Sequence, residues 1–140
     1  MVDPKILNNM NIEEVRAYIL SLPNVAETDP FDENTVVYKV AGKWFAVLSL
    51  DNPDNVAVKC DPDRAVTLRD AYPAITPAWH FNKRHWNYLC FPLLPAELVM
   101  REIRHSYLTV IRKNVTPKAA RLELLADAES CGVKDVEPGE

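Results

Sequence analysis

Three β-rich runs follow one another in the first half of the chain with very short connections between them. The runs 36–40 and 43–50 consist mostly of β-branched, aromatic and other apolar residues, and only Ala41 and Gly42 separate them. A turn rich in Asp, Asn and Pro then leads to a third run at 56–60. Sequential strands with such tight connections pair side by side in alternating directions. The sequence therefore predicts an antiparallel meander at the centre of the fold.

Helical patterns flank this meander. Each predicted helix begins with residues that are typical of helix N-termini or shows apolar residues at helical spacing. We expect one helix at 12–22 behind the capping box of Asn11 and Glu14, and a second at 62–72 behind the cap Asp61. A long third helix is expected to start near Pro95, with buried positions up to Ile111, and a fourth at 117–130 with Thr116 as cap and Pro117 at the first position.

The remaining segments complete the predicted order. Residues 24–35 and 74–82 are rich in helix-breaking and polar residues and are expected to be loops, while 86–91 is expected to be a fourth strand. The order α-β-β-β-α-β-α-α predicts an α+β fold with an antiparallel sheet of about four strands, a meander plus one.

The size of the chain agrees with one folded unit. It has 140 residues, of which 48% are hydrophobic and 26% charged, and these values are typical of a globular domain. We expect a single domain over 1–140, with its core at about 10–115, an extra C-terminal helix, and a polar, frayed tail over 133–140.

The sequence also predicts the cell compartment. No apolar run approaches the roughly 18 residues that cross a membrane, and the N-terminus does not resemble a signal peptide. Cys60, Cys90 and Cys131 are odd in number and far apart, which favours reduced thiols. We expect a cytoplasmic protein with no membrane association, and the sequence leaves its oligomeric state open.

Four stretches resemble the MmcQ/YjbR family of small bacterial proteins. The resemblance covers about Met10 to Val115, and the order in which the stretches occur is more specific than any one of them. They are 38–46 (Tyr-Lys-Val-Ala-Gly-Lys-Trp-Phe-Ala), 58–62 (Val-Lys-Cys-Asp-Pro), 77–86 (Pro-Ala-Trp-His-Phe-Asn-Lys-Arg-His-Trp) and Ser106-Tyr107.

The resemblance implies a fold and suggests a function. The family fold is likened to frataxin (CyaY-like) and to the double-wing DNA-binding module of a phage transcription activator, which implies helices packed on one face of the antiparallel sheet. DNA binding follows only as an analogy between folds. The segment after Val115 extends past the usual family core, and the first helix offers only Glu13 and Glu14, so the iron binding of frataxins is not carried over.

The sequence predicts no catalytic residues, no metal site and no cofactor. His80, His85 and Cys90 match no zinc spacing, and the intervening Lys83 and Arg84 would repel a cation. The serines lack a Gly-x-Ser-x-Gly elbow, and the chain's three glycines do not form a phosphate-binding loop. We therefore expect a protein that is not an enzyme.

The charge is unevenly distributed along the chain. The net charge is −4, yet residues 36–113 hold eleven basic and seven acidic side chains, a balance of +4, between acidic ends of −5 over 1–35 and −3 over 114–140. Basic side chains contact phosphates, and aromatic rings stack on bases. The sequence thus indicates a nucleic-acid-binding surface made of Lys39, Lys43, Lys59, Lys83, Arg84, Trp44, Trp79, His80 and Trp86.

Three functions remain open at this point. The first is a DNA-binding module that acts through this basic and aromatic surface. The second is a non-enzymatic module that binds an unknown protein partner through a sheet face or edge. The third is small-ligand or metal binding centred on His80, His85 and the tryptophans.

Overall fold

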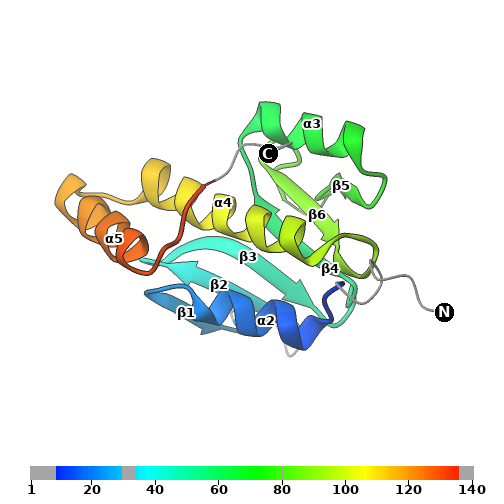
Figure 1. The fold of residues 1–140 in the computed structure, drawn as a ribbon, viewed down its shortest axis with the longest axis horizontal. Helices are drawn as coiled ribbons and strands as arrows, with labels where there is room; N and C mark the ends of the chain where they lie inside the picture. The colour runs from blue at the N-terminus through cyan, green and yellow to red at the C-terminus, as the bar shows by residue number, and fades with distance from the viewer. Residues whose placement is uncertain (1–8, 30–33, 80, 136–140) are drawn as a thin grey trace.

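The computed structural model describes residues 9–29, 34–79 and 81–135 (Figure 1). Its helices are α2 (Ile12–Ser21), α3 (Pro62–Ala71), α4 (Ala96–Asn114) and α5 (Lys118–Ser130), with one short 3-10 helix, η1 (Phe91–Leu93). Its strands are β1 (Val25–Thr28), β2 (Thr35–Val40), β3 (Lys43–Ser49), β4 (Asn55–Lys59), β5 (Ile75–Pro77) and β6 (Trp86–Cys90).

All six strands form one antiparallel sheet in the order β1-β2-β3-β4-β6-β5. The predicted meander is confirmed, and the fourth predicted strand, β6, pairs with β4. The prediction of about four strands was too low, because β1 and β5 lie in the segments 24–35 and 74–82 that were predicted as loops. Both are short edge strands, and β5 ends in Pro77, so neither carries the long β-rich pattern of an inner strand.

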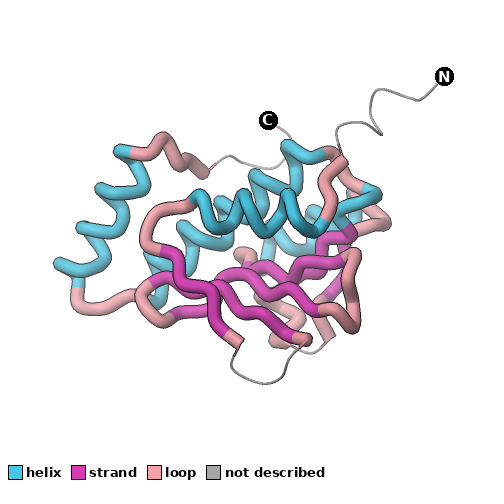
Figure 2. Tube along the Cα trace, turned by 90° about the horizontal axis from the view of Figure 1, so that it is seen from below, coloured by secondary structure: helices cyan, strands magenta, loops and turns pink. Residues whose placement is uncertain are grey.

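Helices cover one face of the sheet, as predicted (Figure 2). Strand residues alternate between the two faces, and one set of them packs with α2, α3 and α4 in the larger of two apolar clusters, the helix-side core. Phe45, for example, meets Tyr107 of α4 edge to face at 5.4 Å between ring centroids. We call the other side of the sheet the open face.

The β2–β3 hairpin turns at Ala41 and Gly42, as predicted. Both residues have positive φ, 50° and 77° respectively, which matches the twist of a two-residue hairpin. The pairing shifts beyond this turn, since Lys39 lies opposite Trp44 while Tyr38 lies opposite Ala46. Phe45 is therefore an extra, bulged residue on β3.

A side chain of α4, Ser106, joins β3 to β4 beside this bulge. The Ser106 hydroxyl donates to the Phe45 carbonyl at 2.5 Å and accepts the Lys59 N–H at 2.8 Å. Ser106 is fully buried, so its hydroxyl satisfies two backbone groups that would otherwise lie buried and unpaired.

The helix ends confirm some predictions and correct others. The capping box of Asn11 and Glu14 is present. Asp61 is the N-cap residue of α3, but its side chain makes no capping bond and instead pairs with Lys113 of α4. Helix α5 begins one residue later than predicted, at Lys118, and Pro117 rather than Thr116 is the residue at its N-cap.

The segment after α5 remains in contact with the rest of the fold. Gly132 has a φ of 74° and ends the helix, as predicted. Val133 then packs against the helix-side core, and Asp135 accepts hydrogen bonds from α4. The fraying predicted from residue 133 therefore does not apply to Val133 or Asp135.

Candidate nucleic-acid interface

A second, smaller apolar cluster covers part of the open face. We call it the open-face cluster; it consists of Val37, Val47, Ala57, Ala78 and Trp86, with Trp44, Phe81 and Tyr88 packed against it. The chain after β5 folds back over the sheet here, because the Phe81 ring stacks on Trp86 with 5.0 Å between centroids and meets Tyr88 edge to face at 6.5 Å.

Beside this cluster, four predicted site residues form a row across the open face. Lys39 on β2 lies opposite Trp44 on β3, and Lys59 on β4 lies opposite Trp86 on β6. Directly opposed residues share a face, and both pairs share theirs with the open-face cluster. Adjacent strands are about 4.8 Å apart, so the row spans about 14 Å. We call this alternation of cation and aromatic ring the Lys–Trp row.

The other predicted basic residues surround the row. Lys43 is exposed at the same hairpin, although its pairing with Val40 places it on the helix side of the sheet. Lys83 lies over the ring of Trp79, with its Nζ 4.9 Å from the centroid. Arg84 lines a polar hollow next to the C-terminal end of α4. His80 lies outside the described residues.

The cations of this surface have no acidic partners in the described part of the chain. Among the described residues, no carboxylate forms an ion pair with Lys39, Lys43, Lys59, Lys83 or Arg84. The backbone of Lys59 places its side chain on the open face, but the ammonium reaches round the end of β4 and donates to the Asn114 side chain at the end of α4 at 2.9 Å. Burial and the neighbouring Lys113 ammonium both lower the pKa of Lys59. Lys39, Lys43 and Lys59 lie at the end of the sheet that carries the β2–β3 hairpin, whereas Lys83 lies with Trp79 toward the β3–β4 turn.

The aromatic members of the surface differ in accessibility. Trp79 is 67% exposed, whereas Trp86 is 9% exposed beneath Phe81. Trp44 is half-buried. Trp79 and Trp44 can thus offer ring surface to a ligand, while Trp86 mainly supports the sheet face from which the lysines project.

Trp79 also borders a hollow of about 410 Å³ near the β3–β4 turn. Tyr88 lies against the same space, and its remaining walls are polar: Ser49, Asp51 and Asn52. A flat ring with polar groups beside it is the usual arrangement for holding a planar, hydrogen-bonding group such as a base.

An ionic cluster on the helix side was not predicted. Arg64 of α3 donates to both carboxylate oxygens of Glu102 on α4, at 3.0 and 2.9 Å, and Arg101 donates to the same carboxylate at 2.9 Å. Arg64 and Glu102 are 8% and 1% exposed. The sequence does carry one signal for this cluster. Glu102 follows Leu98 by four residues, so the helical spacing places a charged side chain on the buried side of α4.

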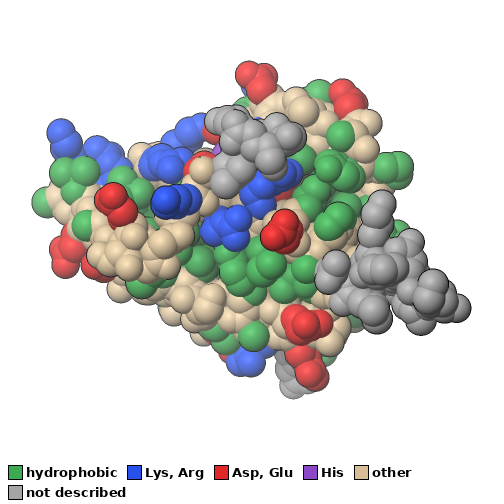
Figure 3. Space-filling model, in the orientation of Figure 1, with side chains coloured by type: hydrophobic (Ala, Val, Ile, Leu, Met, Phe, Trp, Pro, Cys, Tyr) green, Lys and Arg blue, Asp and Glu red, His purple; other side chains and the backbone are tan. Residues whose placement is uncertain are grey.

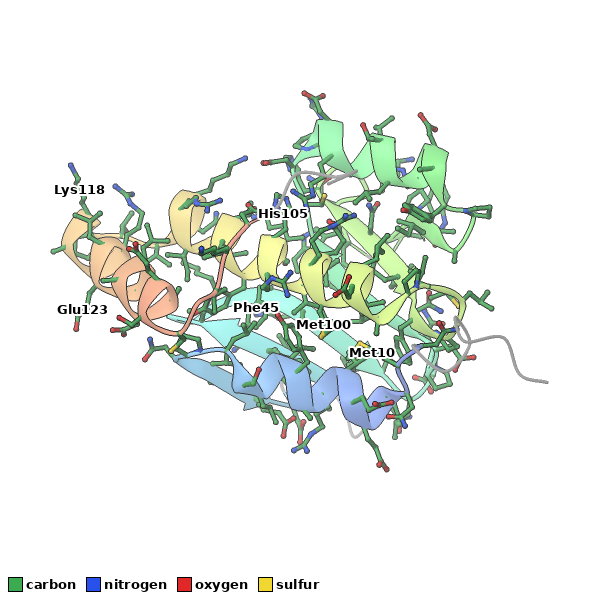
Figure 4. All side chains as sticks on the ribbon, viewed as in Figure 1. Met10, Phe45, Met100, His105, Lys118 and Glu123 are labelled. Atoms are coloured by element: carbon green, nitrogen blue, oxygen red, sulfur yellow. The ribbon has the colours of Figure 1, made fainter. Side chains whose placement is uncertain are left out.

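Asp135 joins this cluster from the C-terminal segment. Its carboxylate receives hydrogen bonds from His105 at 3.0 Å, from Arg112 at 3.0 Å and from Arg64 at 3.4 Å. Figure 4 shows His105 on α4 beside the end of this segment. Figure 3 shows Lys and Arg side chains gathered over α4 and α5 on the helix-covered face, with acidic side chains between them.

Other predicted features can be located in the structure. Cys60 is buried, and burial raises the pKa of its thiol to about 12, so it remains protonated at neutral pH. In the described part of the chain, no group of three or more His, Cys, Asp or Glu side chains is placed to hold a metal ion. None of the described helices is both long and apolar enough to cross a membrane.

Comparison with known proteins gives the family. The YjbR family model matches residues 20–109. The chain is 35% identical to the uncharacterized protein YbdF of Escherichia coli O157:H7 over 75 residues, which is 53% of this chain and 62% of YbdF. It is 29% identical to the uncharacterized protein YjbR of Escherichia coli K12 over 79 residues, which is 56% of this chain and 67% of YjbR.

Solved structures share the fold. The crystal structure of Deinococcus radiodurans protein DR2400, a DUF419 domain, is 35% identical with a TM-score of 0.75, and the match covers 95% of this chain and 96% of that one. A protein from Pseudomonas syringae, 23% identical with a TM-score of 0.62, matches over 69% of this chain and 96% of its own, and shows the fold alone. The resemblance noted in the sequence is confirmed, and the chain belongs to the YjbR family.

Proposed function

We propose that this protein binds DNA through the open face of its sheet, and that it binds single strands more tightly than duplex. The observation that carries the proposal is the Lys–Trp row, in which each of two lysines lies directly opposite a tryptophan on the neighbouring strand. A single strand presents its phosphates to cations and its unstacked bases to rings at the same time.

The lack of ion pairs between the predicted basic residues and described carboxylates supports this proposal. Ion pairs within a protein reduce the positive charge that phosphates can meet, and the five predicted basic residues make none with described carboxylates. Association that depends on such cations releases counterions from the DNA, so the affinity falls steeply as salt is added.

The position of the rings favours single strands. Trp79, at 67% exposure, stands beside a hollow with polar walls at the far side of the open-face cluster from the β2–β3 hairpin. A base in duplex DNA is stacked on both sides and cannot reach such a ring. An unpaired base can stack there while its phosphates follow Lys83 and the Lys–Trp row.

The test is a fluorescence-anisotropy titration with a labelled oligonucleotide of about 15 nucleotides, as single strand and as duplex, at several salt concentrations. We expect the wild-type protein to prefer the single strand. The double variant Lys39→Ala/Lys83→Ala should bind more weakly, and its log–log salt slope should be shallower by about 0.7 for each lysine removed.

The matched control is Lys118→Ala on α5, which removes an exposed lysine that belongs to neither the Lys–Trp row nor the loop beside it. It should leave the affinity and the salt slope nearly unchanged. Absence of binding to either form of DNA at about 50 mM salt would overturn the proposal. Equal weakening by the control would show that binding follows net charge rather than this surface.

A further inference from the structure

The carboxylate of Asp135 lies in a cradle of three cationic or hydrogen-bond-donating side chains. His105 and Arg112 of α4 each approach it to 3.0 Å, and Arg64 of α3 approaches to 3.4 Å. We call Arg64, His105 and Arg112 the anion cradle. Its occupant comes from the segment that follows α5, beyond the residues matched by the family model.

Two members of the cradle are held in place without Asp135. Arg64 is fixed by its two bonds to Glu102. His105 is 2% exposed, and its Nε2 accepts the backbone N–H of Asp61 at 3.3 Å. That bond leaves the ring proton on Nδ1, the nitrogen that faces the carboxylate. Two of the three members of the cradle are therefore preorganised for an anion, while Arg112 has Asp135 as its partner.

The surroundings of the cradle have room for a larger anion than a carboxylate. The hollow around it measures about 590 Å³. Arg84 and Lys113 add positive charge to its walls, and Asp61 and Asp63 add negative charge. Lys113 is paired with Asp61, whereas Arg84 has no ion pair with a described carboxylate. A phosphate group presents several acceptor oxygens and suits three converging donors.

The electrostatics of Asp135 agree with this geometry. Burial by itself raises the pKa of the Asp135 carboxyl, but the hydrogen bond and charge of His105, together with Arg112 and Arg64, outweigh it and hold the pKa well below its usual range. The cradle thus favours a full negative charge at this position.

We propose that the anion cradle is a phosphate-binding site, and that Asp135 and an external phosphate group compete for it. The C-terminal segment then acts as an internal occupant that a phosphate displaces. The three cradle residues are not members of the Lys–Trp row, although Lys113, which lines the same hollow, lies near the Lys59 ammonium.

The test is isothermal titration of inorganic phosphate into the 140-residue protein at constant ionic strength. Removing the internal competitor with Asp135→Ala should tighten phosphate binding about ten-fold or more, equivalent to about 1.4 kcal/mol. Adding Arg112→Ala to that variant should reverse the gain, because it removes an exposed member of the cradle.

The matched control is Asp63→Ala, which removes the same charge from the same hollow but not from the cradle. If Asp135→Ala and Asp63→Ala tighten phosphate binding equally, or if neither binds phosphate, the proposal is overturned. Circular dichroism checks that each variant is folded. Asp135→Asn, which keeps a hydrogen-bond acceptor but not the charge, replaces Asp135→Ala if the latter unfolds, and a smaller gain is then expected.

The source of the phosphate is distinguished by two further titrations. An oligonucleotide with a 5′-phosphate should gain affinity over its unphosphorylated form in Asp135→Ala if the cradle takes the end of a DNA strand. Equal affinities for the two oligonucleotides, with inorganic phosphate still bound, indicate a small free phosphate ligand. Failure of DNA binding alone leaves the phosphate result standing, so the two proposals fail separately.

Discussion

The two faces of the sheet use basic residues in different ways. On the helix side, Arg64 and Arg101 meet Glu102, and Arg112 meets Asp135. In the Lys–Trp row, Lys39 lies opposite Trp44, and Lys59, whose ammonium donates to Asn114 of α4, lies opposite Trp86. Neither lysine meets a described carboxylate. Both sets come from the same basic stretch of sequence.

A count of charges along the chain does not separate cations that are paired within the fold from cations that are free of such pairs. A cation that is buried with a carboxylate contributes to the fold and little to the outer field. A cation without such a partner contributes little to the fold and much to the field that a ligand meets. The helix side therefore predicts large effects on stability, and the open face predicts small ones.

The largest expected effect is on the buried pair. Glu102→Ala leaves the Arg64 guanidinium buried without its bidentate partner, and we expect a loss of about 3–5 kcal/mol in the free energy of unfolding. Urea unfolding measures it. Arg16→Ala, which breaks the pair with Glu27 at the surface, should cost about 1 kcal/mol or less. Similar losses in the two variants would remove the contrast between buried and exposed cations.

The next effect concerns the hydroxyl that joins β3 to β4. Ser106→Ala leaves the Lys59 N–H and the Phe45 carbonyl without their shared partner in a buried place, so we expect a loss of about 1–3 kcal/mol. Ser130→Ala, at an exposed position at the end of α5, is the control and should be nearly neutral. A neutral Ser106→Ala would mean that water or backbone movement restores these bonds.

The pH dependence tests the carboxylate that links the C-terminal segment to α4. Because the folded-state pKa of Asp135 is depressed, its charge stabilises the fold above the unfolded-state value of about 4, and this contribution is lost as the pH falls further. Asp135→Asn should therefore be less stable than wild type at pH 7, and the gap should narrow below about pH 4. Thermal unfolding across this range measures the gap, and a constant gap contradicts the assignment.

The smallest expected effect is on the two lysines at the β2–β3 hairpin, Lys39 on the open face and Lys43 on the helix side of the sheet. Lys39→Ala and Lys43→Ala break no ion pair with a described carboxylate, so each should change the free energy of unfolding by about 0.5 kcal/mol or less. The same urea titrations provide the measurement. A loss of about 2 kcal/mol from either would mean that cations without a described acidic partner also maintain the fold.

Local signals predicted the inner elements of the fold. Gly42 between two β-rich runs predicts the hairpin, and Asn11 with Glu14 predicts the start of α2. Strands β1 and β5 could not be predicted in this way. They become strands because their backbones pair with β2 and β6. Their own three or four residues show no clear alternation of buried and exposed side chains.

The candidate sites also contain some contacts that local sequence predicts and others that only the tertiary packing brings about. The pairing of Lys39 with Trp44 follows from a hairpin that the sequence reveals. The pairing of Lys59 with Trp86 depends on β6 joining β4, which no local pattern specifies. The cradle around Asp135 unites residues from α3, α4 and the segment after α5, and its ion pairs depend on the final packing.

The strand order also has a consequence for folding kinetics. Strands β1 to β4 pair with their neighbours in sequence, but β6 reaches β4 only after the chain has passed through residues 60–85. Closing this longer loop costs more entropy than closing a hairpin turn. We therefore expect the β2–β3–β4 meander to form early in refolding and β6 to join late, so that Trp86 reports a later step than Trp44.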